Sequence, residues 1–524
     1  MKTRDPQWYD LFERRRTRRD FLRVSGGVVG LLALGTVPGC GRSVRVFSDP
    51  FALGVASGDP TPDGAVLWTR LARASLDGAG ALSDAVAVEW EVADDELFAS
   101  VVQRGDATAF PELGHSVHVE VPGLRPGREY FYRMIVGGEA SPVGRTRTAP
   151  AAGAPVDRMR FGFASCQHYE TGWYTALRHM ALEDLDLIVH LGDYIYEGPP
   201  NPRVRAHEGP EIHTLDDYRA RYATYRADPD LQAAHAAAPW VVTWDDHEVD
   251  NNYADDVAED EQSKDELLLR RAAAYQAYYE FMPLRRSSMP SGPDMLLYRR
   301  LAFGDLLEMR VLDTRQYRSD QPCEDGNVPS CAAHIAPEQS ILGAAQRDWL
   351  FEGLAATRAR WNVLAQQVMV ARFRGARDDG TETWSMDKWD GYPRERQALL
   401  DVFAGSETPN PVVLTGDIHS NWVTDLRRDF DDERSPVVGT EFVGTSLTSG
   451  GDGAPMAAGG ERALSNNPHI KYYNGQRGYV VCDVTPELWT AAYRVVPVVT
   501  EPGGPVETAA TFVVEAGQPG AQRA

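Results

Sequence analysis

The alternation of short apolar segments with helical segments beyond about residue 155 constrains the fold of this chain most. Each apolar run has the length of a strand and is bounded by polar or turn residues, which is typical of buried strands. We expect strands at residues 159–164, 187–192, 240–244, 307–312, 362–365, 412–416 and 441–445. Helices are expected at residues 215–225, 265–281 and 344–358. Strands alternating with helices predict a layered α/β domain, which we assign to residues 151–500.

Four of these strands run directly into side chains that can bind metal ions. In chain order, these side chains include Cys166, Asp193, Tyr196, Asp245, Asp246, His247, Asn251, Asn252, Asp417 and His419. Ligands of open α/β sheets bind beyond the carboxyl ends of the strands. Because carboxylate, imidazole, thiol and phenol groups all occupy that position here, the sequence predicts one metal site at this edge.

The spacing within the motifs suits a pair of ions. Asp417 and His419 are two residues apart, so an extended backbone points both side chains to the same face. A turn after Asp193 can bring Tyr196 back toward an ion that Asp193 holds. The two oxygens of the Asp193 carboxylate can bridge two ions. Ions about 3.5–4 Å apart clamp a phosphoryl group and activate water.

Residues 44–150 differ from the rest of the chain in composition. Strand-like segments at 66–70, 85–92, 116–121 and 129–136 are separated by turns, which predicts an all-β sandwich of fibronectin type. The end of the chain, residues 501–524, is rich in Gly, Pro and Ala without helical periodicity. We expect a tail there, and no helical lid. The Gly-rich stretch 449–453 lacks the lysine of a phosphate-binding loop and is expected to be a plain loop.

The first 40 residues are expected to be a twin-arginine signal peptide. Arg18 and Arg19 precede an apolar run at 24–37 that is short for a membrane span. The protein is then exported by the twin-arginine translocon and is periplasmic, cell-surface or secreted. The alternatives of a lipid anchor at Cys40 and of ordinary peptidase cleavage both remain open.

The net charge of −23 excludes general binding to nucleic acid. An acidic protein can still bind an anionic substrate if arginines or metal ions supply local positive charge. The cysteines divide into classes: Cys323 and Cys331 flank a short loop and are expected to form a disulfide, whereas Cys482 lies in an apolar run and is expected to be a buried thiol.

Five sequence motifs resemble those of a known protein family. They are Phe-Ala-Leu-Gly-Val-Ala-Ser-Gly-Asp-Pro at 51–60, Gly-Asp-Tyr-Ile-Tyr-Glu at 192–197, Trp-Asp-Asp-His-Glu-Val at 244–249, Leu-Asp-Thr-Arg-Gln-Tyr-Arg at 312–318 and Leu-Thr-Gly-Asp-Ile-His at 414–419. In order and content these resemble the motifs of PhoD-type alkaline phosphatases, which belong to the calcineurin-like metallophosphoesterases. The resemblance covers roughly residues 50–498. It implies a four-layer αββα metallophosphoesterase domain behind the fibronectin-like sandwich, an α/β fold class overall.

The resemblance also implies a mixed centre of Fe3+ and Ca2+. Cys166, Asp193 and Tyr196 would hold the iron, with His419 or a neighbour completing the ligand set. Asp193 would bridge to calcium, to which Asp417 and either Asn252 or Asn251 would add oxygen ligands. The sequence departs from the wider superfamily at 165–167 and 245–248, where Asp-x-His and Gly-Asn-His-Glu are usual, and both departures match the PhoD type.

Two further residues are candidates for catalysis. The family places an arginine against the phosphate near Arg270 and Arg271, and we select Arg271; the alternative is an exposed helix face paired with nearby acids. His247 either donates a proton or orients a metal ligand.

We therefore expect an exported metal-dependent alkaline phosphatase that hydrolyses phosphate esters with a metal-activated water. A phosphodiesterase or phospholipase D-like hydrolase on the same fold is the first alternative. A non-catalytic metal-binding lipoprotein is the second, and it requires a coordination shell with no room for water.

Overall fold

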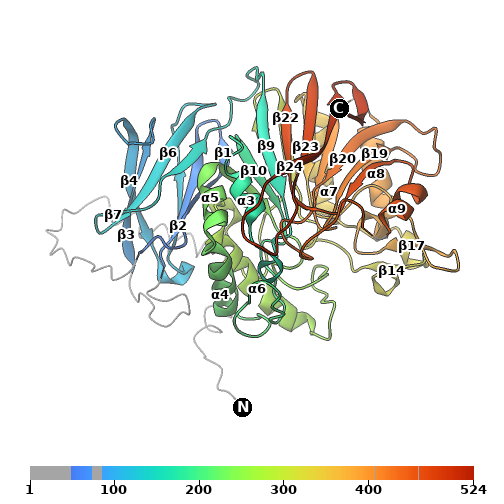
Figure 1. Ribbon diagram of the computed structural model, residues 1–524, viewed down its shortest axis with the longest axis horizontal. Helices are drawn as coiled ribbons and strands as arrows, with labels where there is room; N and C mark the ends of the chain where they lie inside the picture. The colour runs from blue at the N-terminus through green and yellow to red at the C-terminus, as the bar shows by residue number, and fades with distance from the viewer. Residues whose placement is uncertain (1–48, 73–84, 406, 458) are drawn as a thin grey trace, which may run out of the picture.

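The computed structural model describes residues 49–72, 85–405, 407–457 and 459–524, which form a mixed α/β protein as predicted (Figure 1). The expected signal peptide and Cys40 lie outside the described residues. Within the described ranges, no helix combines the length and the apolar character that a membrane crossing requires.

The largest sheet has the strand order β25-β24-β23-β22-β9-β10-β11-β1-β2-β5. Its central strands β9, β10 and β11 are parallel, so their carboxyl ends meet at one edge. The strands of this sheet are β1 (Val55–Thr61), β2 (Gly64–Arg70), β5 (Ser116–Val121), β9 (Met159–Ala164), β10 (Leu187–Leu191), β11 (Pro239–Thr243), β22 (Arg477–Val484), β23 (Leu488–Val496), β24 (Glu507–Glu515) and β25 (Gln518–Arg523).

The second sheet has the order β12-β13-β15-β18-β20-β19-β21, with β13, β15, β18 and β20 parallel. Its strands are β12 (Arg299–Phe303), β13 (Leu307–Val311), β15 (Trp361–Ala365), β18 (Pro411–Thr415), β19 (Asn421–Arg427), β20 (Val437–Val443) and β21 (Ile470–Asn474). One hydrophobic core contains side chains of both sheets, among them Val189 from β10 and Val363 from β15. The two sheets therefore pack face to face.

Helices cover the outer face of each sheet. Alternation along a strand explains this, because Val189 enters the core between the sheets whereas Ile188 packs with Tyr222 and Tyr278 of the helices. The helices on this side are α3 (Thr175–Met180), α4 (Leu215–Arg226), α5 (Pro229–Ala237) and α6 (Lys264–Phe281). On the second sheet they are α7 (Gly343–Ala356), α8 (Pro393–Phe403) and α9 (Gly460–Asn466). Thr214 and Ser263 form capping boxes that fix the starts of α4 and α6.

The N-terminal region forms a separate sheet of order β4-β3-β6-β7, with β8 also paired to β6. Its strands are β3 (Val86–Ala93), β4 (Val101–Ala109), β6 (Glu129–Val136), β7 (Glu139–Ala140) and β8 (Gly144–Arg147). A hydrophobic core joins this sheet to β1, β2 and β5. Those three strands, however, belong to the large sheet, because β1 pairs in parallel with β11 at Gly58 and Trp240. A Cβ at Gly58 would lie 2.7 Å from the Trp240 carbonyl oxygen, so only glycine permits this close pairing.

Residues 501–524, which the sequence analysis set apart as a tail, contain two strands of the large sheet. β24 pairs antiparallel with β23, and β25 pairs with β24. The Gly- and Pro-rich run before β24 suggested a tail, whereas the side chains of β24 itself alternate between buried and more exposed positions. As predicted, Cys323 and Cys331 form a disulfide and Cys482 is buried. The disulfide lies next to a small sheet of β14 (Asn327–Val328), β16 (Gly375–Ala376) and β17 (Glu382–Ser385).

Candidate metal centre

The predicted ligands occupy unusual backbone positions just beyond the strands. Cys166 follows β9, Asp193 follows β10 and Asp417 follows β18, and their φ angles are 58°, 56° and 61°. His419 and Asn252 have φ angles of 56° and 50°. A left-handed conformation of a non-glycine residue costs on the order of 1–3 kcal/mol and clusters at functional sites. Here it turns the chain sharply at the strand ends and directs the side chains toward one another.

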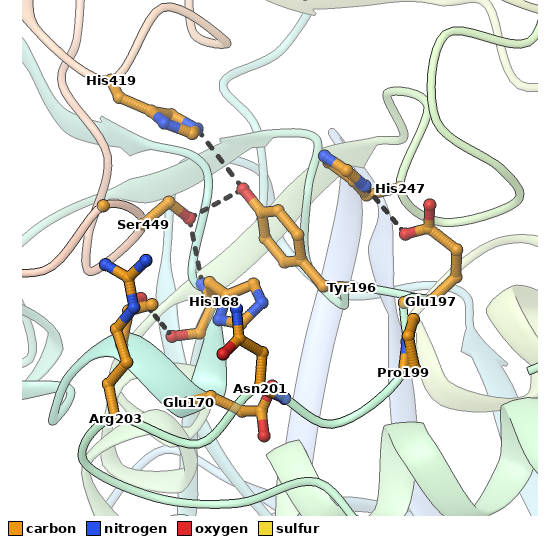
Figure 2. Close-up of a pocket in the computed structure, with 13 residues that line it drawn as sticks. His168, Glu170, Tyr196, Glu197, Pro199, Asn201, Arg203, His247, His419 and Ser449 are labelled. Carbon is orange, nitrogen blue, oxygen red and sulfur yellow. Dashed lines mark hydrogen bonds and ion pairs between the residues drawn. The ribbon is translucent and has the colours of Figure 1, made fainter. Parts of the chain in front are cut away.

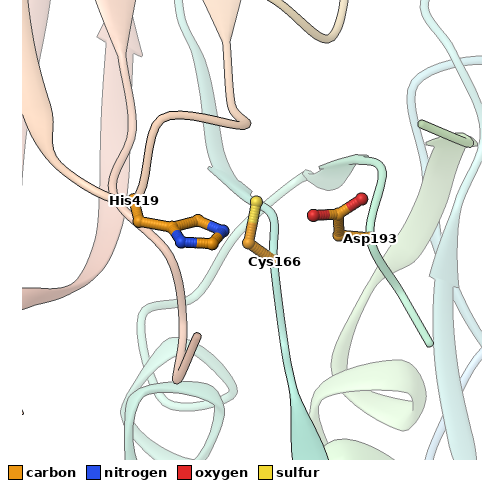
Figure 3. A group of neighbouring side chains, drawn as sticks. All are labelled: Cys166, Asp193 and His419. Atoms are coloured by element: carbon orange, nitrogen blue, oxygen red, sulfur yellow. The ribbon is translucent and has the colours of Figure 1, made fainter. Parts of the chain in front are cut away.

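A first group of metal-competent side chains comes from the segments that follow three different strands (Figure 3). Donor atoms of Cys166, Asp193 and His419 all lie within 4.8 Å of one another. The Tyr196 hydroxyl donates to Asp193 Oδ2 at 2.8 Å and lies 3.4 Å from His419 Nε2. Ser449 Oγ donates to the same hydroxyl at 2.7 Å. The structure thus brings together the four residues that the sequence analysis assigned to one ion.

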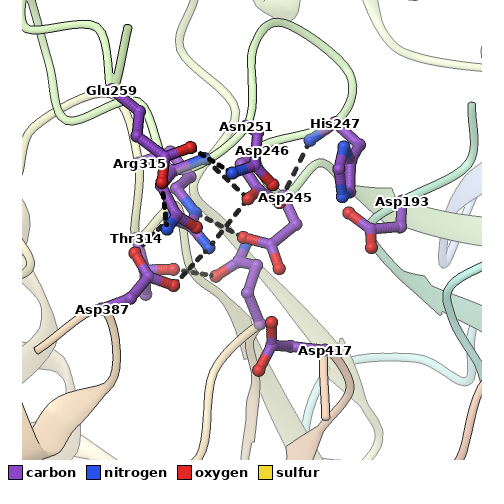
Figure 4. A network of polar contacts seen from close by, with 12 residues as sticks. Asp193, Asp245, Asp246, His247, Asn251, Glu259, Thr314, Arg315, Asp387 and Asp417 are labelled. Carbon is purple, nitrogen blue, oxygen red and sulfur yellow. Dashed lines mark hydrogen bonds and ion pairs between the residues drawn. The ribbon is translucent and has the colours of Figure 1, made fainter. Parts of the chain in front are cut away.

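A second group shares Asp193 with the first. Donor atoms of Asp193, Asp246 and His247 also lie within 4.8 Å of one another. Figure 4 shows Asp245 and Asp417 beside this group. Asp245 and Asp246 directly follow a buried strand and were predicted to be metal-competent for that reason, but neither was assigned as a ligand of either ion.

Carboxylate oxygens in this cluster lack the partners that buried oxygens normally have. Asp193 Oδ1 and Asp245 Oδ2 are buried and accept no hydrogen bond from the described residues. Asp417 Oδ2 lies 2.8 Å from Lys388 Nζ. Buried, unpartnered carboxylate oxygens are unfavourable unless a cation is present. The donor set therefore fits bound metal ions.

The electrostatics of the protein alone lead to the same conclusion. Burial and the nearby Asp193 raise the pKa of the Cys166 thiol well above its usual value. Burial also raises the pKa of Asp193 and of Asp245. A bound cation reverses these effects, because it stabilises thiolate and carboxylate. Burial lowers the pKa of His419 to about 3, so its imidazole is neutral and able to ligate.

His247 lies between the second group and a carboxylate. Its Nδ1 is 2.8 Å from Glu197 Oε2, and its ring centroid is 4.1 Å from that of Tyr196. Burial alone would lower the pKa of His247, but the charges of Glu197, Asp246 and Asp193 outweigh burial and raise it well above its usual value. The imidazole therefore retains its proton in the metal-free site.

Both candidate asparagines lie beside the second group. The Asn252 backbone N–H donates to Asp246 Oδ2 at 2.9 Å, and its side-chain amide donates to Asp325 at 2.8 Å. The Asn251 backbone N–H donates to Glu197 Oε1 at 3.0 Å, and its side-chain amide donates to Glu259.

The predicted phosphate-binding residue Arg271 has other partners in this structure. Its guanidinium donates to the carbonyl oxygens of Asp255 at 2.7 Å and Pro293 at 2.8 Å. Arg270 is likewise engaged, with Glu211 at 2.8 Å and Asp250 at 2.9 Å. Both arginines are buried rather than on an exposed helix face. Contacts formed with distant segments hold both side chains, and these contacts have no local sequence signal.

A cavity of about 320 Å³ opens beside the first group (Figure 2). Tyr196, His168, His247 and His419 line it, and the more exposed Asn201 and Arg203 line its outer part. Ser449 also lines it, so the stretch expected to be a plain loop contributes to the site. Asn201, Arg203 and Ser449 lie in loops without a strand-end signal, whereas His168 follows β9 two residues after Cys166 and could have been found by that signal.

Comparison with known proteins decides the family. The family model described as PhoD-like phosphatase matches residues 161–493, and the model of the PhoD-like phosphatase N-terminal domain matches residues 39–150. The chain belongs to the PhoD-like phosphatase family. The predicted resemblance, and with it the prediction of a phosphatase of the PhoD type, is confirmed.

Relatives within the PhoD-like family match over nearly the whole chain. Alkaline phosphatase D of Bacillus subtilis (strain 168) is 51% identical over 521 residues, covering 97% of this chain and 89% of that protein. A solved structure described as "Structure of PhoD" superposes with a TM-score of 0.90 at 53% identity, covering 92% of this chain and 93% of that one.

Proposed function

We propose that this PhoD-like phosphatase hydrolyses phosphate esters at the cluster around Asp193, with metal ions and an activated water. The observation that carries the proposal is the convergence of the Cys166, Asp193 and His419 donor atoms within 4.8 Å at the strand ends. The cavity beside Tyr196 and His419 leaves room for water and substrate. That room argues against a closed structural site, and so against a non-catalytic lipoprotein.

The chemistry of the donors supports Fe3+ in one position and Ca2+ in the other. Cys166, Asp193, Tyr196 and His419 would hold the iron, because thiolate, phenolate and imidazole suit a transition metal. Asp193, Asp417 and Asn252 would hold calcium, which prefers oxygen donors, and Asp246 is a further candidate. When bound, such ions polarise the phosphoryl group and activate water.

The protein residues have separable roles in this proposal. Asp193 orients the donors of both groups, because its carboxylate belongs to each of them. Glu197 holds His247 by a 2.8 Å contact, and the imidazole, when protonated, can deliver a proton to the leaving oxygen. Arg271 has no part in the proposal because backbone carbonyls engage its guanidinium.

The decisive experiment replaces the shared carboxylate. Asp193→Asn should abolish turnover of p-nitrophenyl phosphate while circular dichroism shows a folded protein. Asp348→Asn is the matched control, because that side chain is 64% exposed and pairs only with Arg347 in the described structure. Full activity of Asp193→Asn would show that the reaction occurs elsewhere.

Elemental analysis of protein purified without chelator tests the metals. Iron and calcium near stoichiometric amounts would support the assignment. Zinc or manganese would leave the hydrolase in place but overturn the ligand roles of Cys166 and Tyr196. Metal-free protein with full activity would refute the mechanism.

Export and domain organisation complete the proposal. The resemblance and the packing of helices outside two facing sheets support a four-layer αββα domain behind a fibronectin-like sandwich. The sequence of residues 1–40 supports export by the twin-arginine translocon to a periplasmic, cell-surface or secreted location, with or without a lipid at Cys40. Replacing Arg18 and Arg19 by lysine should retain the precursor inside the cell, and unaltered export would refute the signal assignment.

A further inference from the structure

In the described structure, Arg203 lines the outer part of the cavity without an ion-pair partner. Within the described part of the chain, the Arg203 guanidinium makes no ion pair or hydrogen bond, although it lines the cavity that reaches Tyr196 and His419. Figure 2 shows this guanidinium directed toward Ser449. An unpaired cation facing a cavity is notable in a protein with a net charge of −23.

The other cations near the cavity already have partners. Arg221 donates to the carbonyl oxygens of Tyr196 and Gly198. Arg477 donates to Gly451 at 2.6 Å and to the His419 carbonyl. Lys388 lies 2.8 Å from Asp417. Arg203 is therefore the lining cation that remains available to an anionic ligand within the described residues.

The backbone around Arg203 is fixed by a buried glutamate. Glu170 Oε2 accepts from the Asn201 backbone N–H at 2.9 Å, and the Glu170 carbonyl oxygen accepts from the Val204 N–H at 2.9 Å. Arg205, two residues after Arg203, forms an ion pair with Asp228, and its Cζ atom lies 3.8 Å from the centroid of the Tyr169 ring. Because both flanks are held, little backbone entropy is lost when Arg203 binds a ligand.

Polar groups next to Arg203 complete a binding surface. The His168 ring centroid lies 4.3 Å from that of Tyr196, and His168 Nδ1 is buried without a hydrogen-bond partner in the described structure. Asn201 also lines this part of the cavity. The carboxylates of Glu170 and Glu197 are engaged by backbone N–H groups and by His247, so they compete little for the guanidinium.

We propose that Arg203, His168 and Asn201 form an outer subsite that binds a second anionic group of the substrate, one carried by its leaving group. This inference rests on the proposed function, because it assumes that hydrolysis occurs at the cluster around Asp193. The favoured substrates are then phosphate esters whose alcohol bears a further phosphate. Arg203 acts as a specificity-determining residue, since its planar donors match a phosphate group.

A matched pair of substrates tests the subsite. Glycerol 1-phosphate and glycerol 1,3-bisphosphate share one scaffold and differ by the second phosphate. The ratio of their kcat/KM values should be about tenfold in favour of the bisphosphate, the effect expected of one charge-assisted hydrogen bond. Its two equivalent phosphates alone would give a ratio of about two by statistics.

Three variants make the test specific. Arg203→Gln should reduce the ratio toward two, whereas Arg203→Lys should retain part of the preference because it keeps the charge. Arg358→Gln is the control: this exposed arginine lines a different cavity, and its loss should leave the ratio unchanged. Circular dichroism should confirm that each variant is folded.

The outcomes separate the two claims. Hydrolysis of neither substrate by the wild-type enzyme would refute the proposed function. Hydrolysis of both with a ratio near two, or a wild-type ratio in Arg203→Gln, would overturn the subsite and leave the phosphatase in place.

Discussion

Arg315 joins the acidic cluster to the segment that carries Lys388, and its removal should destabilise the protein strongly. Its side chain is fully buried and donates to Asp245 at 2.5 Å and to both oxygens of Asp387 at 2.6 and 3.0 Å. In Arg315→Met, Asp387 keeps donors from Arg318 and Gln321 at 3.0 Å each. The Asp245 carboxylate keeps no hydrogen bond from the described residues. In chelator-treated protein, where no cation is bound beside Asp245, this uncompensated buried charge should reduce the free energy of unfolding by about 3–5 kcal/mol.

The pH dependence of this loss gives a second check. Burial already raises the pKa of Asp245, and removal of the arginine should raise it further. The folded variant then holds a proton that the unfolded chain releases at lower pH, so its stability should fall as pH rises. The deficit relative to wild type should therefore be smaller at pH 5 than at pH 8.

Equilibrium urea unfolding, followed by circular dichroism, measures both effects. Arg347→Met is the control, because Arg347 is 38% exposed and its pair with Asp348 should contribute less than about 1 kcal/mol. If Arg315→Met loses no more than this control, or if its deficit shrinks at high pH, the guanidinium does not compensate Asp245.

Three further results are expected. His247→Gln should reduce kcat by about 10²–10⁴-fold if the imidazole delivers the proton, and an unchanged pH–rate profile would assign it a purely structural role. Cys166→Ser should lower the iron content of the purified protein, measured by elemental analysis; full occupancy would remove the thiol from the ligand set. In chelator-treated protein, burial raises the pKa of Glu248 to about 8 in the folded state, well above the unfolded value of about 4.3. The folded state thus binds the extra proton between these values, so the Glu248 contribution to stability is lost as pH rises through about 8. The urea midpoint of the wild type should therefore fall relative to that of Glu248→Gln between pH 5.5 and pH 8.5; a relative rise would contradict this.

The sequence was sufficient to predict that the candidate ligands at the strand ends lie close together. β9 begins and ends where the apolar run predicts, and the same pattern locates Cys166, Asp193 and Asp417. The local pattern of apolar residues determines where a buried strand ends. Because neighbouring strands are parallel, their carboxyl ends then lie at the same edge of the sheet. Asp246 follows the same rule, although it was not assigned to an ion.

Features that depend on distant partners could not be predicted in this way. Arg271 was assigned to phosphate, but Asp255 and Pro293 hold it, and these contacts depend on the tertiary fold. Arg203 has no local signal either, because Glu170 fixes the loop that presents it. Similarly, the membership of β1 in the large sheet depends on pairing with β11, about 180 residues away by the numbering of Gly58 and Trp240.

That pairing of β1 with β11 has a consequence for how the protein can be divided. A truncation near residue 150 would divide the chain in a loop, but it would also remove β1, β2 and β5 from the large sheet. Strand β11 would then become an exposed edge strand. Such edges recruit other chains and promote aggregation. The N-terminal region therefore covers the edge of β11 in the large sheet. In a chimera of two homologues, β1 and β11 should come from the same parent, so that their pairing is kept.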